Sequence, residues 1–254
     1  FIHMSGHNKW STIKRKKGAA DAKRGKIFTK IIKEITISVR EGGTDPAGNA
    51  RLRLAIQNAK GVNMPKDNIE RAIKKAGGSD AEAYNEITYE GYGPNGIAVF
   101  VEGLTDNTNR TLSSIRFIFS KYNGTLGPNG SLTFLFDRKG VFTINPEDVG
   151  SRDMESLELE LIDAGAEDIE TDEDIITVTC AMDDFGNLNR KLEELEIEPD
   201  EAKLQRVPKD TKTLDVESAR KVMRLIEALE DDDDVQAVYH NLEITDELAR
   251  ALEE

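Results

Sequence analysis

The hydrophobic residues in the first third of the chain recur with the period of an α-helix. The first predicted helix ends at the Gly42-Gly43 pair and carries five apolar residues spaced i, i+3, i+4, i+7 and i+11: Phe28, Ile31, Ile32, Ile35 and Val39. Two further stripes predict helices around residues 52–59 and, after Pro65, around residues 66–76. Three short helices joined by Gly and Pro breaks predict a small helical domain whose core is formed by these stripes.

Beyond Ser79 the pattern changes to short strands that alternate with amphipathic helices. Strands are predicted at residues 87–92, 97–101, 132–136, 141–144, 175–180 and 235–239. Helices are predicted at residues 112–122, 154–164, 185–195 and 219–229. Elements of this size are typical of sandwiches in which helices cover one face of a sheet, so we expect an α+β protein.

One glycine-rich segment imitates a nucleotide-binding motif. Residues 91–96, Gly-Tyr-Gly-Pro-Asn-Gly, match the G-x-G-x-x-G fingerprint of dinucleotide-binding proteins. That fingerprint requires the glycines to open a helix, whereas here a strand-like run follows and Pro94 lies inside the motif. The segment therefore predicts a turn, and the same Gly-Pro-Asn-Gly sequence recurs at residues 127–130 before another predicted strand.

Charge divides the chain more sharply than hydrophobicity does. The formal net charge is −14, but residues 1–80 carry 18 Lys and Arg against 7 Asp and Glu, a net charge of +11. Residues 81–254 carry 16 against 41, a net charge of −25. Such asymmetry is typical of a basic nucleic-acid-binding segment joined to an acidic body, and chance clustering on a solvated surface is the alternative.

The basic residues concentrate in an arm, residues 4–20, and in the first predicted helix. Binding of nucleic-acid phosphates requires several Lys and Arg side chains, each adding a salt-dependent increment to the affinity. The predicted phosphate-binding residues are Lys9, Lys14, Arg15, Lys16, Lys17, Lys23, Arg24, Lys26, Lys30 and Lys33. Three of them, Lys26, Lys30 and Lys33, repeat at i, i+4 and i+7 and therefore form a stripe along the helix.

Two further residues are candidates for the same interface. Trp10 lies among the cations of the arm and either stacks on an unpaired base or packs back on the helical domain. Arg110 lies in an Asn-Thr-Asn-Arg turn, where it either binds phosphate or bonds its own loop as a helix-start residue. No base-reading helix can be recognised, so the sequence predicts binding by one end of the molecule or to RNA presented beside protein.

The sequence gives little support for catalysis, a metal or another cofactor. Cys180 is the single cysteine and is most simply a buried apolar residue. His240 has no nucleophile motif around it, so a hydrolase that uses His240 is the weakest alternative. The run Asp231–Asp234 predicts a solvated turn rather than a divalent-metal loop, which needs further spaced ligands. We expect a non-enzymatic protein without a cofactor.

Nothing in the sequence predicts a membrane or secreted protein. The longest apolar run has five residues, Ile97 to Val101, whereas a membrane span needs about 20. The chain does not open with the pattern of a secretory signal peptide. We therefore expect a cytoplasmic protein with no membrane partner.

Several longer motifs resemble those of the YebC/PmpR family, whose mitochondrial relatives are translational activators. The motifs that carry the resemblance are residues 5–10, 21–30, 89–94, 106–110 and 233–241. The resemblance implies an N-terminal helical domain and two ferredoxin-like α/β domains, the third inserted into the second. The implied boundaries are residues 4–80 for the first domain, 81–137 with 205–246 for the second, and 138–204 for the third.

The resemblance also implies a function. Members of the family are labelled DNA-binding transcriptional regulators, and some are regarded as translation factors that act on the ribosome. The charge map favours RNA and the ribosome, because a basic arm suits irregular RNA and an acidic body suits protein contacts. We expect ribosomal RNA or promoter DNA as the partner. An adaptor that binds a protein through its acidic domains is the stronger alternative.

Overall fold

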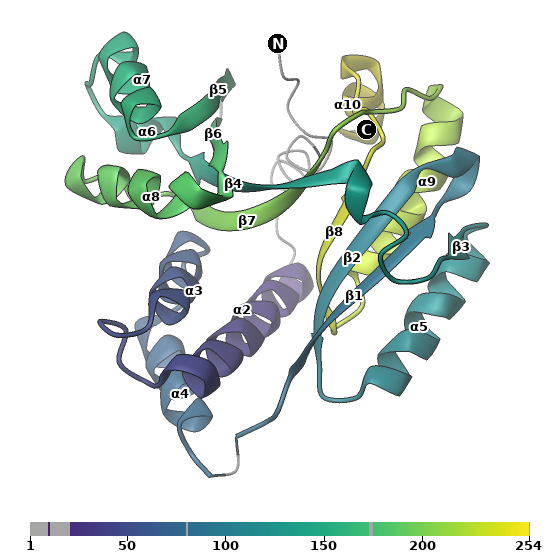
Figure 1. Cartoon of the computed structure of the whole chain (residues 1–254), viewed down its shortest axis with the longest axis horizontal. Helices are drawn as coiled ribbons and strands as arrows, with labels where there is room; N and C mark the ends of the chain where they lie inside the picture. Colours follow the sequence, from purple (N-terminus) through teal and green to yellow (C-terminus); the bar gives the residue numbers. More distant parts are fainter. Residues whose placement is uncertain (1–9, 11–20, 80, 173–174, 254) are drawn as a thin grey trace. The chain divides into compact units, whose positions relative to one another are not determined.

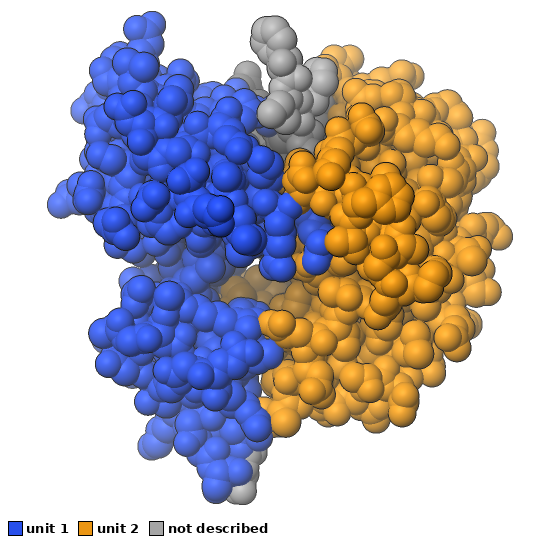
Figure 2. Space-filling view, viewed as in Figure 1, with its two compact units in different colours: residues 1–2, 34–81, 138–206 blue, residues 3–33, 82–137, 207–254 orange. Residues whose placement is uncertain are grey.

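A computed structural model describes residues 10, 21–79, 81–172 and 175–253 of the chain. Helices come first and two four-stranded sheets follow, which confirms the expected α+β fold. Figure 2 distinguishes two compact units. The first comprises residues 1–2, 34–81 and 138–206, and the second comprises residues 3–33, 82–137 and 207–254. The three-domain boundaries stay a prediction, because the first unit joins residues of the first and third predicted domains.

The N-terminal helices follow the predicted apolar stripes. They are α2 (Asp21–Gly42), α3 (Ala50–Gly61) and α4 (Lys66–Ala76). Most of the stripe residues are buried or half-buried, among them Ile35, Val39, Leu52, Ile69 and Ala72, whereas Ile32 is 37% exposed. The side chain of Asn49 caps α3 by accepting from the N–H of Leu52 at 3.0 Å and donates to the carbonyl of Ser38 at 2.7 Å. This buried amide fixes the connection between α2 and α3.

The second unit is built on a sheet in the order β3-β1-β2-β8 (Figure 1). Its strands are β1 (Asn85–Tyr92), β2 (Ala98–Thr105), β3 (Thr125–Leu126) and β8 (Val235–His240). Helices α5 (Thr108–Lys121), α9 (Val216–Glu230) and α10 (Asp246–Glu253) pack against one face, around Val99, Val101 and Val238. The alternate residues, Ala98 and Phe100, form a smaller core with Tyr239. Because successive side chains of a strand point to opposite faces of the sheet, β2 contributes buried residues to the cores on both faces.

The other sheet has the order β5-β6-β4-β7. Its strands are β4 (Phe136–Ile144), β5 (Ala166–Asp172), β6 (Ile175–Ala181) and β7 (Glu201–Pro208). Helices α7 (Met154–Asp163) and α8 (Phe185–Glu194) pack on it, and α6 (Pro146–Val149) joins β4 to α7. The rings of Phe142 and Phe185 stack with centroids 4.8 Å apart. Because this sheet lies between β3 and β8 in the chain, it interrupts the first sheet, as expected of an inserted domain.

Two local predictions fare differently. Residues 93–96 form a turn around the short 3-10 helix η1 (Pro94–Gly96), in which Asn95 and Gly96 have φ of 59° and 71°, so the predicted turn is confirmed. The predicted strand at 132–136 is wrong, because residues 133–135 form another 3-10 helix, η2 (Thr133–Leu135). There the buried carboxylate of Glu90 accepts from the N–H groups of Gly130, at 2.6 Å, and Leu132. A side chain therefore satisfies backbone donors that a strand partner would otherwise take.

Every helix formed by the described residues is too short or too polar to cross a bilayer.

Candidate nucleic-acid interface

Helix α2 places the three lysines of the predicted stripe on one face, which meets the end of α9 and the loop after it. We call the three lysines the lysine stripe: Lys26, Lys30 and Lys33. We call the residues they meet the acidic turn: Glu230, Asp231, Asp232, Asp233 and Asp234. Lys26 Nζ donates to the carbonyl and to Oδ1 of Asp231, both at 3.0 Å, and Lys30 Nζ donates to the carbonyl of Glu230 at 2.8 Å. The lysines thus satisfy carbonyls that a helix end leaves without intrahelical partners.

Lys33 makes the innermost contact of the stripe. Its Nζ lies 2.8 Å from Asp234 Oδ1 and donates to the carbonyls of Asp233, at 2.7 Å, and Leu104, at 3.3 Å. Lys33 is 7% exposed and Asp234 is 6% exposed, so the pair is buried. All three donor hydrogens of the ammonium group have an acceptor within the molecule. The lysine is therefore engaged within the molecule in this structure, and its role in phosphate binding stays a prediction.

The other oxygen of Asp234 completes a buried network. Oδ2 accepts from Thr111 Oγ1 and an Arg110 nitrogen, both at 2.7 Å, and from Thr105 Oγ1 at 3.1 Å. Burial raises the pKa of Asp234, but hydrogen bonds from Arg110, Lys33 and Thr111 outweigh it and hold the pKa well below its usual value. The carboxylate is therefore charged at neutral pH. Its hydrogen bonds connect α2 and α5 to the residue that immediately precedes β8.

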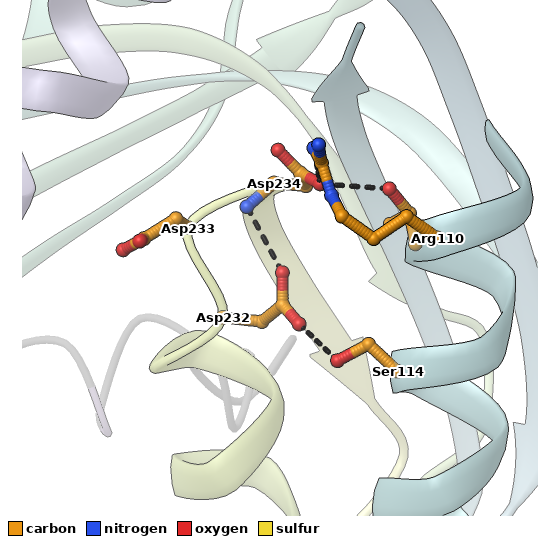
Figure 3. Close-up of a pocket in the computed structure, with 6 residues that line it drawn as sticks. Arg110, Ser114, Asp232, Asp233 and Asp234 are labelled. Carbon is orange, nitrogen blue, oxygen red and sulfur yellow. Dashed lines mark hydrogen bonds and ion pairs between the residues drawn. The ribbon is translucent and has the colours of Figure 1, made fainter. Parts of the chain in front are cut away.

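A cavity of about 270 Å³ opens beside this network, lined by Arg110, Thr111, Ser114, Asp232, Asp233 and Asp234 (Figure 3). Ser114 Oγ donates to Asp232 Oδ2 at 2.5 Å, and Asp232 Oδ1 accepts from the N–H of Asp234 at 3.0 Å. Asp233 points away from the other labelled side chains (Figure 3). Carboxylates dominate the lining, so the cavity does not suit a phosphate. No group of three or more His, Cys, Asp or Glu within the described ranges is arranged to hold a metal.

These contacts correct the expectation for the run Asp231–Asp234. Asp231 and Asp233 are exposed, as a solvated turn requires, whereas Asp234 is buried and accepts from four side chains. The helix macrodipole disfavours acids at a helix C-terminus. The lysine stripe supplies the positive charge that offsets this cost.

Trp10 lies in the core of the second unit. Its ring is 2% exposed and belongs to the apolar cluster of α5, α9 and β2, and its Nε1 donates to Glu230 Oε2 at 3.1 Å. Base stacking requires an exposed ring face. Trp10 is therefore packed in a core, as its alternative prediction stated, although that core belongs to the second unit, and its stacking role stays a prediction.

Arg110 bonds its own loop, as its alternative prediction stated. It donates to Asp106 Oδ1 at 2.7 Å, one turn earlier in the chain, as well as to Asp234. Both carboxylates raise the pKa of Arg110, the hydrogen bond to Asp234 most strongly. The guanidinium already has two carboxylate partners, so the prediction that it binds phosphate is not supported by the geometry.

The remaining predicted cations lie largely outside the described residues. These are Lys9, Lys14, Arg15, Lys16 and Lys17 of the arm, together with the side chain of Lys23. Arg24 is described: it is exposed, and its guanidinium lies 5.6 Å from the centroid of the Phe28 ring. Their role in phosphate binding stays a prediction. Of the described candidates, Lys26, Lys30, Lys33, Trp10 and Arg110 converge on the acidic turn, and Arg24 does not contact it.

A further basic group escaped the sequence analysis. The last two turns of α4 carry Arg71, Lys74 and Lys75, all of which are exposed. Their i, i+3, i+4 spacing is visible in the sequence, but their local density of cations is lower than that of the arm and α2. We call these three residues the α4 patch.

His240 and Cys180, the two residues considered above for chemistry, are both buried. Burial lowers the pKa of His240 to about 4, and the ring is fully buried in β8, so it cannot meet the substrate that a hydrolase would require. Burial also raises the pKa of Cys180 to about 11, which keeps the thiol protonated at neutral pH. Cys180 is buried in the core of the second sheet, which confirms its prediction as an apolar residue.

A basic helical segment followed by two helix-covered sheets, one interrupting the other in the chain, defines an α+β protein with a basic N-terminal sequence. Family models match nearly the whole chain: the TACO1/YebC protein N-terminal domain matches residues 8–79, and the TACO1/YebC second and third domain matches residues 84–242. The chain belongs to the TACO1/YebC family, as its sequence motifs indicated.

Relatives of the chain are similar over almost their full length. A probable transcriptional regulatory protein of Amoebophilus asiaticus is 52% identical over 94% of this chain and 98% of its own. One of Chlorobaculum parvum, with the same description, is 50% identical over 99% and 100%. The crystal structure of a conserved hypothetical protein from Aquifex aeolicus, Aq1575, covers 88% of this chain and 91% of its own, with a TM-score of 0.79 and 42% identity.

Proposed function

We propose that this chain is a regulator of gene expression that binds nucleic acid through its N-terminal basic arm. The observation that carries the proposal is the separation of charge: the first 80 residues have a net charge of +11, and the remainder has −25. The lysine stripe accounts for only three of the 18 cations in that segment. The description of the relatives as probable transcriptional regulatory proteins supports the same class of function.

We infer that the target is RNA presented on the ribosome. A body with a net charge of −25 repels a long duplex laid across it, but it suits contacts with basic proteins beside an RNA. The second candidate is promoter DNA, which is favoured by the description of the relatives as probable transcriptional regulatory proteins. The two targets differ in what displaces the protein, so one competition experiment separates them.

The test is co-sedimentation of the full chain with ribosomes at about 150 mM salt, where exposed charges are screened beyond about 8 Å. Excess duplex DNA is the competitor. Retention on ribosomes in its presence supports RNA as the target, and loss to the DNA supports a transcriptional regulator. A chain that binds neither ribosomes nor DNA contradicts the proposed function.

The arm is tested by reversing three of its cations together, R15E/K16E/K17E. We expect binding to be lost, because each phosphate contact contributes to the affinity, while the thermal midpoint stays nearly unchanged. The matched control, R116E/K121E/R224E, reverses three exposed cations of α5 and α9 and changes the net charge equally. Binding that survives the arm variant would show that the arm is not the interface.

A further inference from the structure

The α4 patch places three exposed cations on one face of the helix, two of which have no neutralising contact within the described residues. Arg71, Lys74 and Lys75 lie at i, i+3 and i+4 and therefore on one face of the helix. All three are exposed, and Arg71 and Lys74 make no hydrogen bond or ion pair with any residue in the described part of the chain. Their charges are accordingly available to an external anion, in contrast to those of the lysine stripe.

The sequence of α4 separates its charges along the helix. Asp67 and Glu70 lie in the first half, where Lys66 pairs with Glu70 at 3.6 Å. Beyond Glu70 every charged residue of the helix is a cation, and the exposed Gly77 and Gly78 that follow add no side chain. Cations in a last turn also complement the helix macrodipole, but that effect does not require three on one face.

The opposite face of α4 holds the patch in place. Ile69, Ala72 and Ala76 are buried, so the helix is fixed in rotation and its basic face is directed to solvent. A rigid helix presents a phosphate-binding group more reproducibly than a loop does. An Arg offers a planar fork that fits phosphate oxygens, and a Lys offers a compact point charge beside it.

We propose that Arg71 and Lys74, with Lys75 beside them, bind the phosphate backbone of the nucleic acid held by the arm. The inference rests on the proposed function and adds a second, structured contact surface to it. The patch binds phosphates and reads no bases, so it acts equally on every sequence. The arm and the α4 patch then share the affinity, and the lysine stripe contributes none.

The experiment uses the full chain and measures fluorescence anisotropy with two probes: a labelled single-stranded RNA of mixed sequence and a DNA duplex of the same sequence. The variant is R71E/K74E, and the matched control is R116E/K121E on α5, which reverses two exposed cations elsewhere. We expect R71E/K74E to weaken binding about tenfold or more. The slope of log affinity against log salt should become shallower by about 1.5, since two phosphate contacts are lost.

The outcomes separate the inference from the function on which it rests. If the wild type binds, R15E/K16E/K17E loses binding and R71E/K74E keeps both affinity and slope, the α4 patch is not a contact and the proposed function stands. If the wild type binds neither probe, the proposed function itself fails. Should R71E/K74E fail to fold by circular dichroism, the neutral variant R71Q/K74Q replaces it, with a several-fold loss expected and an unchanged affinity overturning the inference.

Discussion

Helices α2 and α4 each carry a row of cations on one face, but the two rows have different partners. The lysine stripe of α2 meets carbonyls and carboxylates of the acidic turn, about 200 residues later in the chain. The α4 patch is exposed, and two of its three members have no partner among the described residues. A row of cations on one helix face thus serves folding in α2 and is available for binding in α4, and the difference lies in which residues the fold places opposite each row.

The largest expected effect follows from removing the buried anchor of the lysine stripe. Asp234→Ala leaves Lys33 charged and buried without its carboxylate, while Thr105 and Thr111 lose an acceptor. Removing one partner of a buried ion pair costs about 3 to 5 kcal/mol, so the free energy of unfolding should fall by that amount. Urea denaturation followed by circular dichroism measures the change.

The neighbouring Asp233→Ala is the control for this substitution. The side chain of Asp233 is exposed, and only its carbonyl bonds Lys33, so we expect a change within about 0.5 kcal/mol. Equal losses for the two variants would mean that the acidic turn acts as a diffuse charge and that the Lys33–Asp234 pair has no special weight.

Acid should weaken the contact of α2 selectively. The folded pKa of Asp234 is lowered, so between the ordinary value of 3.8 and the folded value the unfolded chain binds more protons. The stability that Asp234 contributes is therefore fully present above about pH 5 and is lost progressively as the pH falls further. The difference in unfolding free energy between the wild type and Asp234→Asn should shrink between pH 5 and about pH 3.

The α4 patch provides the comparison for this titration. R71Q/K74Q removes no carboxylate, so its difference from the wild type should stay constant over the same pH range. A difference between wild type and Asp234→Asn that does not change with pH would show that Asp234 does not have a lowered pKa.

The smallest expected loss of stability distinguishes the lysine stripe from the α4 patch most directly. K26E/K30E removes two cations from the end of α9 and should lower the free energy of unfolding by about 1 to 2 kcal/mol, a limited loss because the Lys26 side chain is 42% exposed. Its affinity for the RNA probe should stay within about twofold of the wild type, because both lysines are engaged by the acidic turn. Thermal denaturation and anisotropy, applied to the same samples, measure the two quantities.

R71E/K74E should show the reverse, with stability within about 0.5 kcal/mol of the wild type and weakened binding. If K26E/K30E instead loses affinity without losing stability, the lysine stripe faces nucleic acid in solution and its contacts with the acidic turn do not hold.

Most of the fold follows from the sequence wherever hydrophobic periodicity is strong. The strands β1, β2, β6 and β8 and the helices α5, α7, α8 and α9 lie within a few residues of their predictions. Strand β5 was not predicted because acids such as Glu167, Asp168 and Glu170 interrupt its apolar positions. Its backbone is held in a strand by antiparallel pairing with β6. The strand predicted at residues 132–136 was wrong because the carboxylate of Glu90, 42 positions before Leu132, accepts a backbone N–H there. The insertion of one sheet into another came from the family resemblance, since spacing along a chain does not encode it.

The interface was harder to predict because its partners are remote in sequence. A local pattern identified the lysine stripe as a cationic face, but only the three-dimensional structure shows that Glu230 and Asp234 lie against it. The acidic run after α9 is one feature of the sequence from which this contact could have been predicted. Four consecutive acids after a helix C-terminus are unfavourable unless cations from elsewhere approach them, and a basic helix of the same chain was the nearest source.

The position of Trp10 has a practical consequence. It is the only tryptophan of the chain, its indole is enclosed by the core of the second unit, and its N–H donates to the same glutamate whose carbonyl accepts from Lys30. Because indole emission depends on the polarity around the ring, the intrinsic fluorescence of the unlabelled protein reports whether Trp10 is packed against the end of α9. The chain thus contains its own optical probe of that contact, at a single and unambiguous site.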